Sequence, residues 1–281
     1  MSGMRRSLLD SERFLAGFHD ADPGVTSRAF AQLPATMAGS TFASSYDCLA
    51  AVVPAGPATA VDLACGDGYL LALLAARGQP GLALVGVDLS AGELAAARRR
   101  LGVAAALHQA RAQELPLPDG GADVVLCHLA LMLMDDVPRV LAEVRRVLRP
   151  GGVFSAVVGL GSTSPVHPIF VSLLRQYRRL PQFETLRLGD PRLHSTEGIA
   201  ELFTANFAPP AVEEIVLQWR SAPAALWSWF EEMYDTGWLD APDQLGLERR
   251  FLEAVTPLCE ADGKVENHVL LQRITARTRT D

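Results

Sequence analysis

The chain has 281 residues, of which 49% are hydrophobic and 20% charged, and its formal net charge is -7. This composition is typical of a folded globular protein, and no run reaches the ~18 apolar residues that a membrane span needs. The acidic balance disfavours a nucleic-acid partner, because phosphate binding depends on clustered Lys and Arg. The four cysteines are scattered and the first 14 residues lack a signal-peptide core, so we expect a cytoplasmic protein.

The first 56 residues predict a helical N-terminal cap. Phe14, Phe18 and Phe30 supply apolar anchors, and residues 40–53, which include Tyr46, form a further helical stretch. A Pro-Ala-Gly-Pro run then stops that helix. We therefore expect a cap over residues 1–56 and a larger domain over residues 57–281.

From residue 59 onward, apolar runs alternate with helical patterns, which predicts a parallel sheet with helices on both faces. A helix after Asp135 and Asp136 has one apolar face and ends at a Pro-Gly-Gly turn. Five strands are expected near residues 59–63, 83–88, 104–108, 122–127 and 152–158.

The regular pattern breaks after the fifth strand. Residues 159–193 hold several Gly and Pro around an amphipathic segment, which predicts an insertion that we interpret as a lid. Later elements are expected as a helix at 195–203, a strand at 212–219, helices near 223–234 and 243–259, and a strand near 268–276. The fold class that follows is α/β, doubly wound, with a seven-stranded and mostly parallel sheet.

The most informative motif is a glycine-rich turn after the first of these strands. Residues 62–68 read Asp-Leu-Ala-Cys-Gly-Asp-Gly, and Asp88 ends the next strand. Such a strand-turn-helix-strand unit with a terminal acidic residue is typical of adenosine binding. Leu71 stands where a dinucleotide fingerprint needs a small residue, and the chain's one lysine is Lys264, which excludes a Gly-Lys-Ser/Thr phosphate loop.

Three further segments follow this motif in order, at residues 111–120, 122–128 and 140–154. Together with the glycine turn they resemble the class I S-adenosylmethionine (SAM) dependent methyltransferases, of the type 11 kind, over about residues 59–158. The resemblance implies a Rossmann-like methyltransferase fold, SAM as the cofactor and a small-molecule methyl acceptor as the partner.

The resemblance also implies roles for single residues. Asp62 would order the loop beside the SAM ammonium, Asp88 would bind the ribose hydroxyls, and the glycines would let the backbone approach the methionine part. Arg111 departs from the acidic residue that is usual in the family, and Gln113 replaces the usual glutamate. The plainer alternative for Asp62 and Asp88 is that they belong to a capped turn of the kind found in any α/β protein. The full cofactor-binding set expected is Asp62, Ala64, Gly66, Gly68, Asp88, Leu89, Ala112, Gln113 and Cys127.

Two residues are candidates for catalysis. His128 directly follows the fourth strand and is the first candidate for a general base, with Tyr46 of the cap as the second. Each has a plainer alternative, because His128 can simply line the pocket and Tyr46 can simply pack. A base is optional, since the sulfonium is already activated and rate comes from aligning the acceptor. The histidines show no metal-ligand spacing, so we expect no metal.

Several aromatic residues are concentrated late in the chain. They predict either an apolar acceptor pocket or the packing of two C-terminal helices. The residues concerned are Trp219, Trp227, Trp229, Tyr234 and Trp238.

The sequence thus predicts a SAM-dependent methyltransferase, monomeric or homodimeric, that acts on a small apolar or aromatic metabolite in bacterial specialised metabolism. Neither a membrane nor a nucleic acid is expected as a partner. Two alternatives stay open. In one, the protein binds SAM but catalyses a cyclisation or isomerisation without methyl transfer. In the other, it is a degenerate and non-catalytic partner subunit, an alternative that Arg111 keeps open.

Overall fold

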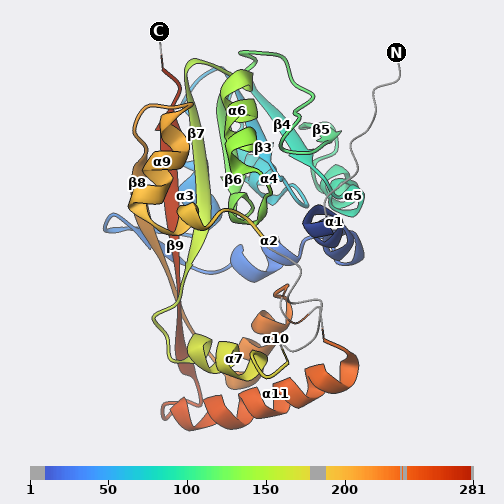
Figure 1. Ribbon diagram of the computed structural model, residues 1–281, viewed down its shortest axis with the longest axis vertical. Coiled ribbons are helices and arrows are strands. Elements are labelled where there is room, and N and C mark those ends of the chain that lie inside the picture. Colours follow the sequence, from blue (N-terminus) through green and yellow to red (C-terminus); the bar gives the residue numbers. More distant parts are fainter. Residues whose placement is uncertain (1–9, 178–187, 235, 237–238, 280–281) are drawn as a thin grey trace.

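The computed structural model describes residues 10–177, 188–234, 236 and 239–279. Within these ranges a nine-stranded sheet runs through the molecule in the order β2-β1-β8-β9-β7-β6-β3-β4-β5 (Figure 1). Helices cover both of its faces, so the protein has the α/β class that the alternating pattern predicts.

Five strands pair in parallel and form one half of the sheet. Each overlaps a predicted strand, although the fifth begins four residues before its predicted start and continues past its predicted end. The five strands are β3 (Ala58–Leu63), β4 (Leu82–Asp88), β5 (Ala106–Gln109), β6 (Ala122–His128) and β7 (Leu148–Gly161). The long apolar runs of β3, β6 and β7 reflect the burial of both of their faces.

The other half of the sheet is antiparallel. Strand β9 (Val265–Arg277) lies between β7 and β8 (Ala211–Ser221) and runs antiparallel to both. A hairpin of β1 (Ala35–Met37) and β2 (Ser40–Phe42) adds two more strands, through the pairing of β1 with β8. The predicted strand count of seven was therefore wrong.

The same hairpin corrects the prediction of a wholly helical cap. Its two turn residues, Ala38 and Gly39, both have positive φ, 49° and 77°. A two-residue hairpin of this kind usually carries Asn or Asp before the glycine, and Ala38 gives no such signal. The cap therefore combines the hairpin with α1 (Asp10–Ala21), α2 (Val25–Phe30) and α3 (Ser45–Ala50).

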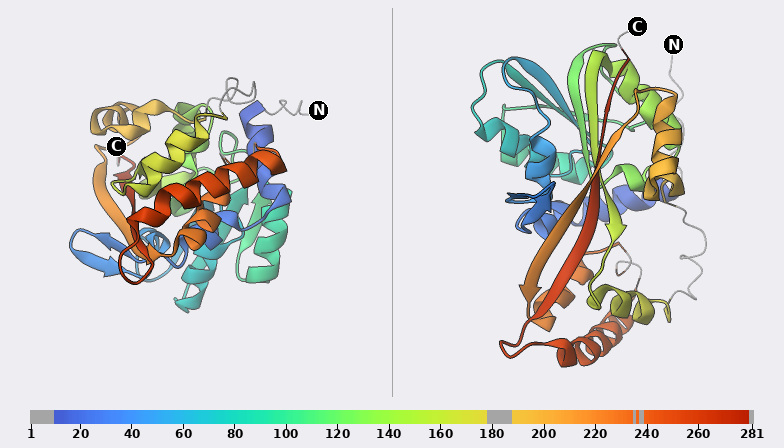
Figure 2. Two further views of the ribbon diagram at one scale, coloured as in Figure 1. Left: turned by 90° about the horizontal axis from the view of Figure 1, so that it is seen from below. Right: turned by 90° about the vertical axis from the view of Figure 1, so that its left-hand side faces the viewer.

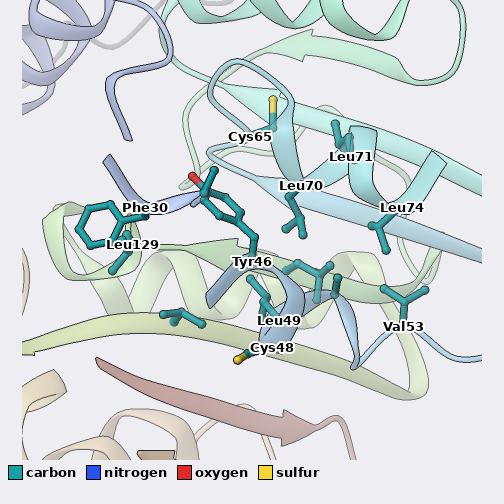
Figure 3. Close-up of a cluster of buried hydrophobic side chains, with 14 of the residues drawn as sticks. Phe30, Tyr46, Cys48, Leu49, Val53, Cys65, Leu70, Leu71, Leu74 and Leu129 are labelled. Carbon is teal, nitrogen blue, oxygen red and sulfur yellow. The ribbon is translucent and has the colours of Figure 1, made fainter. Parts of the chain in front are cut away.

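Two hydrophobic clusters fix the layers of the fold. The first joins α3, α4 (Tyr69–Ala76) and α5 (Ala91–Leu101) to one face of the sheet, and Figure 3 shows its side chains. Leu71 is completely buried there, so the residue that argues against a dinucleotide site is part of the core. The second cluster joins α6 (Val137–Val147) and α9 (Thr196–Thr204) to the other face.

A helical lobe lies apart from these two layers, at the end of the long strands β8 and β9 (Figure 2). It comprises α7 (Val166–Leu174), α10 (Pro223–Glu231) and α11 (Ala241–Val255), which share a third hydrophobic cluster. Within that cluster the rings of Phe170 and Phe230 stack with centroids 4.3 Å apart. Among the described residues, short 3-10 turns lie at Leu131–Leu133, Pro191–His194 and Thr256–Leu258.

The predicted lid falls partly on this lobe. Its amphipathic segment forms α7, which packs against α10 and α11. Residues 178–187 lie outside the described residues, so the lid and the domain boundaries stay predictions. None of the helices in the described ranges has the length and apolar character needed to cross a bilayer.

Three of the late aromatic residues, Trp219, Trp227 and Trp229, take part in packing, whereas Tyr234 lines a cavity. Trp227 is buried in the lobe, 5.7 Å from Phe251 between ring centroids. Trp229 approaches Trp219 at 5.3 Å and donates its indole N–H to the carbonyl of Ala29 at 2.9 Å, which joins the lobe to the cap. Trp238 lies outside the described residues.

Candidate active site

A cavity lies at the carboxyl ends of β3, β4 and β6 and is bordered by α1 and the turn after it. It encloses about 1070 Å³, its open mouth included. Two of the predicted site residues, Gly68 and Cys127, do not line it. The predicted site residues that do are Tyr46, Asp62, Ala64, Gly66, Asp88, Leu89, Ala112, Gln113 and His128.

The glycine-rich turn needs its glycines for two different reasons. Gly66 and Gly68 have left-handed backbone, with φ of 52° and 77°, which favours glycine. A Cβ on Gly68 would lie 2.7 Å from Leu101 and 3.1 Å from Ala97, both on α5. The expectation that a side chain at Gly68 would fill cofactor space is therefore corrected, since that space belongs to helix packing.

Two acidic residues end neighbouring strands at the floor of the cavity. Asp62 is 2% exposed, and burial raises its pKa well above the usual range, with the charges of Asp88 and Asp67 raising it further. Burial also raises the pKa of Asp88, although its carboxylate accepts the amides of Ser90 and Gly66 at 2.8 Å each. A positive charge bound beside them would stabilise the ionised carboxylates and lower both pKa values.

An ion pair lies on the side of the cavity where adenine is predicted to bind. Arg111 donates to Glu12 of α1, with the shorter contact at 2.7 Å. The Gln113 amide nitrogen donates to the carbonyl of Asp135 at 2.6 Å, which leaves the Gln113 amide oxygen as an acceptor. The arginine that departs from the family pattern therefore connects the cap to the cavity wall.

His128 and Tyr46, the two predicted candidates for catalysis, lie together. Their rings stack with centroids 3.6 Å apart, and Ser45 Oγ lies 2.9 Å from His128 Nε2. Burial lowers the pKa of His128 to about 3, whereas burial and nearby carboxylates raise the pKa of Tyr46 well above its usual value. Neither shift suits a general base near neutral pH.

The cap contributes residues that the sequence analysis missed. His19 Nδ1 lies 2.8 Å from Glu93 Oε1, and His19 Nε2 lies 2.8 Å from the Tyr234 hydroxyl. Ser27 donates to Asp67 at 2.7 Å. Among the described residues, no group of three or more His, Cys, Asp or Glu is placed to hold a metal ion.

One sequence pattern identifies a member of this hydrogen-bond network between the cap and α5. Ser90 and Glu93 have the spacing of a capping box at the start of α5, and Ser90 Oγ does accept the Glu93 amide at 3.0 Å. The Glu93 carboxylate instead accepts the Gly24 amide and contacts His19. The spacing identifies Glu93, but not its partners in the cap.

Residues 61–156 match the family model described as a methyltransferase domain. This stretch runs from β3 into β7 and includes the glycine-rich turn, Asp88 and His128. Residues 61–156 therefore belong to a methyltransferase domain.

The methyltransferase domain is similar to several curated enzymes. It is 39% identical to a demethylmenaquinone methyltransferase of Symbiobacterium thermophilum over 99 residues, covering 34% of this chain and 39% of that protein. A trans-aconitate 2-methyltransferase of Deinococcus radiodurans is 32% identical over 169 residues, 60% of each chain. The chain spans half or less of the length of the first curated relatives that it matches.

The fold has a solved counterpart over its whole length. The cyclase SpnF is similar with a TM-score of 0.56 and 17% identity, and the match covers 100% of both chains. At this identity the likeness concerns the fold of the methyltransferase domain and its surrounding elements, and it does not choose a reaction.

Proposed function

We propose that the protein binds SAM in the cavity at the ends of β3 and β4 and transfers its methyl group to a small apolar or aromatic acceptor. The observation that carries the proposal is the placement of Asp62 and Asp88 on adjacent strands of one cavity, within the segment that matches the methyltransferase family. Buried carboxylates with raised pKa values fit a ligand that carries a sulfonium and an ammonium.

The ribose, the ammonium and the adenine of SAM each have residues suited to them. Asp88 uses one oxygen for each backbone amide, so each oxygen keeps a lone pair for a ribose hydroxyl. Asp62 also lines the cavity and would face the ammonium. Ala112 and the free amide oxygen of Gln113 would meet the adenine edge. When bound, SAM supplies a methyl group that its sulfonium already activates.

The rest of the cavity favours an acceptor without negative charge. Among the described lining residues, Arg111 is the single Arg or Lys, and Glu12 already pairs with it. A carboxylate or phosphate would therefore enter the cavity without a free cation to bind it. Apolar side chains provide the matching surface, namely those of Leu15, Ala16, Leu129, Leu133 and Met134.

The protein's own residues contribute mainly alignment and the exclusion of water. The cap covers the cavity through α1 and the Gly24 turn, and the stacked rings of Tyr46 and His128 form part of the wall. Because neither ring has a pKa near neutrality, neither exchanges a proton readily with the acceptor at that pH. Holding the acceptor in line with the S-methyl bond then supplies the rate enhancement.

Two measurements test the proposal. Titration calorimetry should detect binding of SAM and S-adenosylhomocysteine, and absence of SAM binding would end the enzyme proposal. Transfer from methyl-labelled SAM should then be screened with naphthols, quinols, enolisable ketones and, as the contrasting class, carboxylic acids. We expect S-adenosylhomocysteine to form with an uncharged acceptor. If SAM binds but no acceptor yields that product, a role without methyl transfer replaces ours.

A further inference from the structure

Glu12 and Arg111 form an ion pair on the wall of the cavity. The Arg111 guanidinium donates twice to Oε1 of Glu12, from Nε at 3.0 Å and from Nη2 at 2.7 Å. The Glu12 side chain is 8% exposed and that of Arg111 is 20% exposed, and both residues line the cavity. The pair therefore presents both N–H donors and a carboxylate to a molecule bound there.

This wall adjoins the residue proposed to bind the ribose. Strand β5 pairs with β4 so that Gln109 lies opposite Asp88, and the amide of Ala110 donates to the carbonyl of Asp88 at 3.0 Å. From there the chain continues along the cavity through Arg111 to Gln113. Because the base of a nucleoside is attached directly to its ribose, the adenine of SAM would meet this segment when Asp88 holds the ribose.

The amino group of adenine needs hydrogen-bond acceptors on this wall. It carries two N–H donors, and the amide oxygen of Gln113 can accept one of them. Arg111 has only donors, so alone it would set N–H groups against N–H groups. A carboxylate has about four acceptor positions, which allows Glu12 to accept the amino group beside the bonds from Arg111.

We propose that Glu12 of the cap accepts a hydrogen bond from the adenine amino group of SAM, and that Arg111 holds the Glu12 carboxylate in place. This inference rests on the proposed function, because it adds a cap residue to the same cofactor site. The carboxylate that position 111 lacks is then supplied by α1, 99 positions earlier in the chain. Selectivity for adenine therefore depends on the cap, and Arg111 is a positioning residue.

A second carboxylate lies on the same side of the cavity. Asp135 also lines it, and the Asp135 side chain accepts the hydroxyl of Ser11, the residue before Glu12. Asp135 is half-buried, whereas Glu12 is buried and receives two bonds from one guanidinium. Glu12 is thus the more firmly held acceptor, and Asp135 is the alternative that an experiment must distinguish.

Two ligands that differ at the 6-position of the purine test the assignment. S-adenosylhomocysteine carries the amino group there, whereas S-inosylhomocysteine carries an oxygen that accepts hydrogen bonds. Calorimetry should show that the wild type prefers the adenosyl ligand by about 10-fold or more, because the oxygen would face a carboxylate. Glu12→Gln should reduce this preference by about 5-fold or more, since its amide N–H and Arg111 can both donate to the oxygen.

Two matched variants separate Glu12 from other carboxylates. Glu213→Gln breaks an ion pair with Arg273, on residues outside the described lining of the cavity, so the adenosyl preference should equal that of the wild type. Asp135→Asn should also leave the preference unchanged. An unaltered preference in folded Glu12→Gln, or a preference lost in Asp135→Asn alone, would overturn the proposal.

Exchanging the two charges gives a test that does not depend on the folding of Glu12→Gln. The double variant Glu12→Arg with Arg111→Glu keeps the ion pair and keeps one carboxylate on this wall, so the adenosyl preference should be retained. Loss of the preference in that folded variant would contradict the role of the pair. The proposed function fails differently: if neither ligand binds the wild type, the cofactor site is refuted and this inference with it.

Discussion

The backbone amide of Gly24 donates a hydrogen bond of 2.9 Å to Oε2 of Glu93, a residue 69 positions later in the chain. The other oxygen of the same carboxylate lies 2.8 Å from Nδ1 of His19. Glu93 is 2% exposed and lies in the first turn of α5, the helix that also packs against the glycine-rich turn. One buried carboxylate thus joins the cap to the helix that supports the turn.

Loss of this carboxylate should loosen the cap. Glu93→Ala removes both acceptor oxygens, so the Gly24 amide and His19 lose this partner. We expect a cost of about 1–3 kcal/mol, the range for leaving a buried partner unsatisfied. Limited proteolysis should then cut the turn around Gly24 faster than in the wild type. Glu201→Ala, at an exposed partner of Arg192, is the control, and equal cleavage of the two variants would contradict the role of Glu93.

Asp88 should be essential for SAM affinity but not for folding. Asp88→Ala removes the ribose acceptor and frees the amides of Gly66 and Ser90, so calorimetry should show SAM affinity reduced at least 10-fold, about 1.4 kcal/mol or more. Asp123→Ala is the matched control. Asp123 also accepts a backbone amide, that of Thr59 at 2.7 Å, but it does not line the cavity. Unchanged affinity in Asp88→Ala would refute the proposed cofactor site.

SAM affinity should increase with pH through the titration of Asp62. In the free protein the pKa of Asp62 is raised, so below that pKa the carboxyl is protonated and offers no charge to the cofactor. A cationic ligand binds the ionised form more tightly, so binding releases a proton and strengthens as pH rises through the raised pKa. Calorimetry in buffers of different ionisation enthalpy should detect that proton. Asp62→Asn should bind SAM weakly and lose this pH dependence, and an unchanged profile would exclude Asp62 as its source.

The two glycines of the turn should differ in their effect on stability. Gly66→Ala places a Cβ at ordinary contact distance, 3.8 Å from Glu93, so left-handed backbone strain of about 1–2 kcal/mol is the main cost. Gly68→Ala adds a clash with Leu101 at 2.7 Å, and overpacking adds about 1–3 kcal/mol. Urea unfolding should therefore rank Gly68→Ala as the less stable variant. If Gly66→Ala is the less stable variant, α5 shifts to make room for the methyl group added at Gly68.

The sequence predicted the sheet well where its pattern has a direct physical cause. Continuous apolar runs mark strands buried on both faces, and the residues that end β3, β4 and β6, including Asp88 and His128, meet at one edge because parallel strands share their direction. The glycine spacing located the turn that borders the cavity. Nearly all of the predicted site residues are consequently brought together.

Other features depend on contacts that no local pattern encodes. The turn of the β1–β2 hairpin contains Ala38, which has a positive φ that no sequence pattern predicts. Two contacts of the cap join residues far apart in the chain. Glu12 pairs with Arg111, 99 positions later, and His19 contacts Glu93, 74 positions later. Both form only once α1 lies across the sheet edge. Ser45 appeared as an ordinary helix residue, and its bond to His128 is a result of tertiary packing.

The helical lobe has a hydrophobic cluster of its own, formed by α7, α10 and α11 at the far end of β8 and β9. Its members lie outside the stretch that matches the methyltransferase family, residues 61–156. The buried members of this cluster are distinct from those of the two clusters that hold the other helices on the sheet. Shortening one of these side chains would therefore leave a cavity inside the lobe and not beneath the glycine-rich turn.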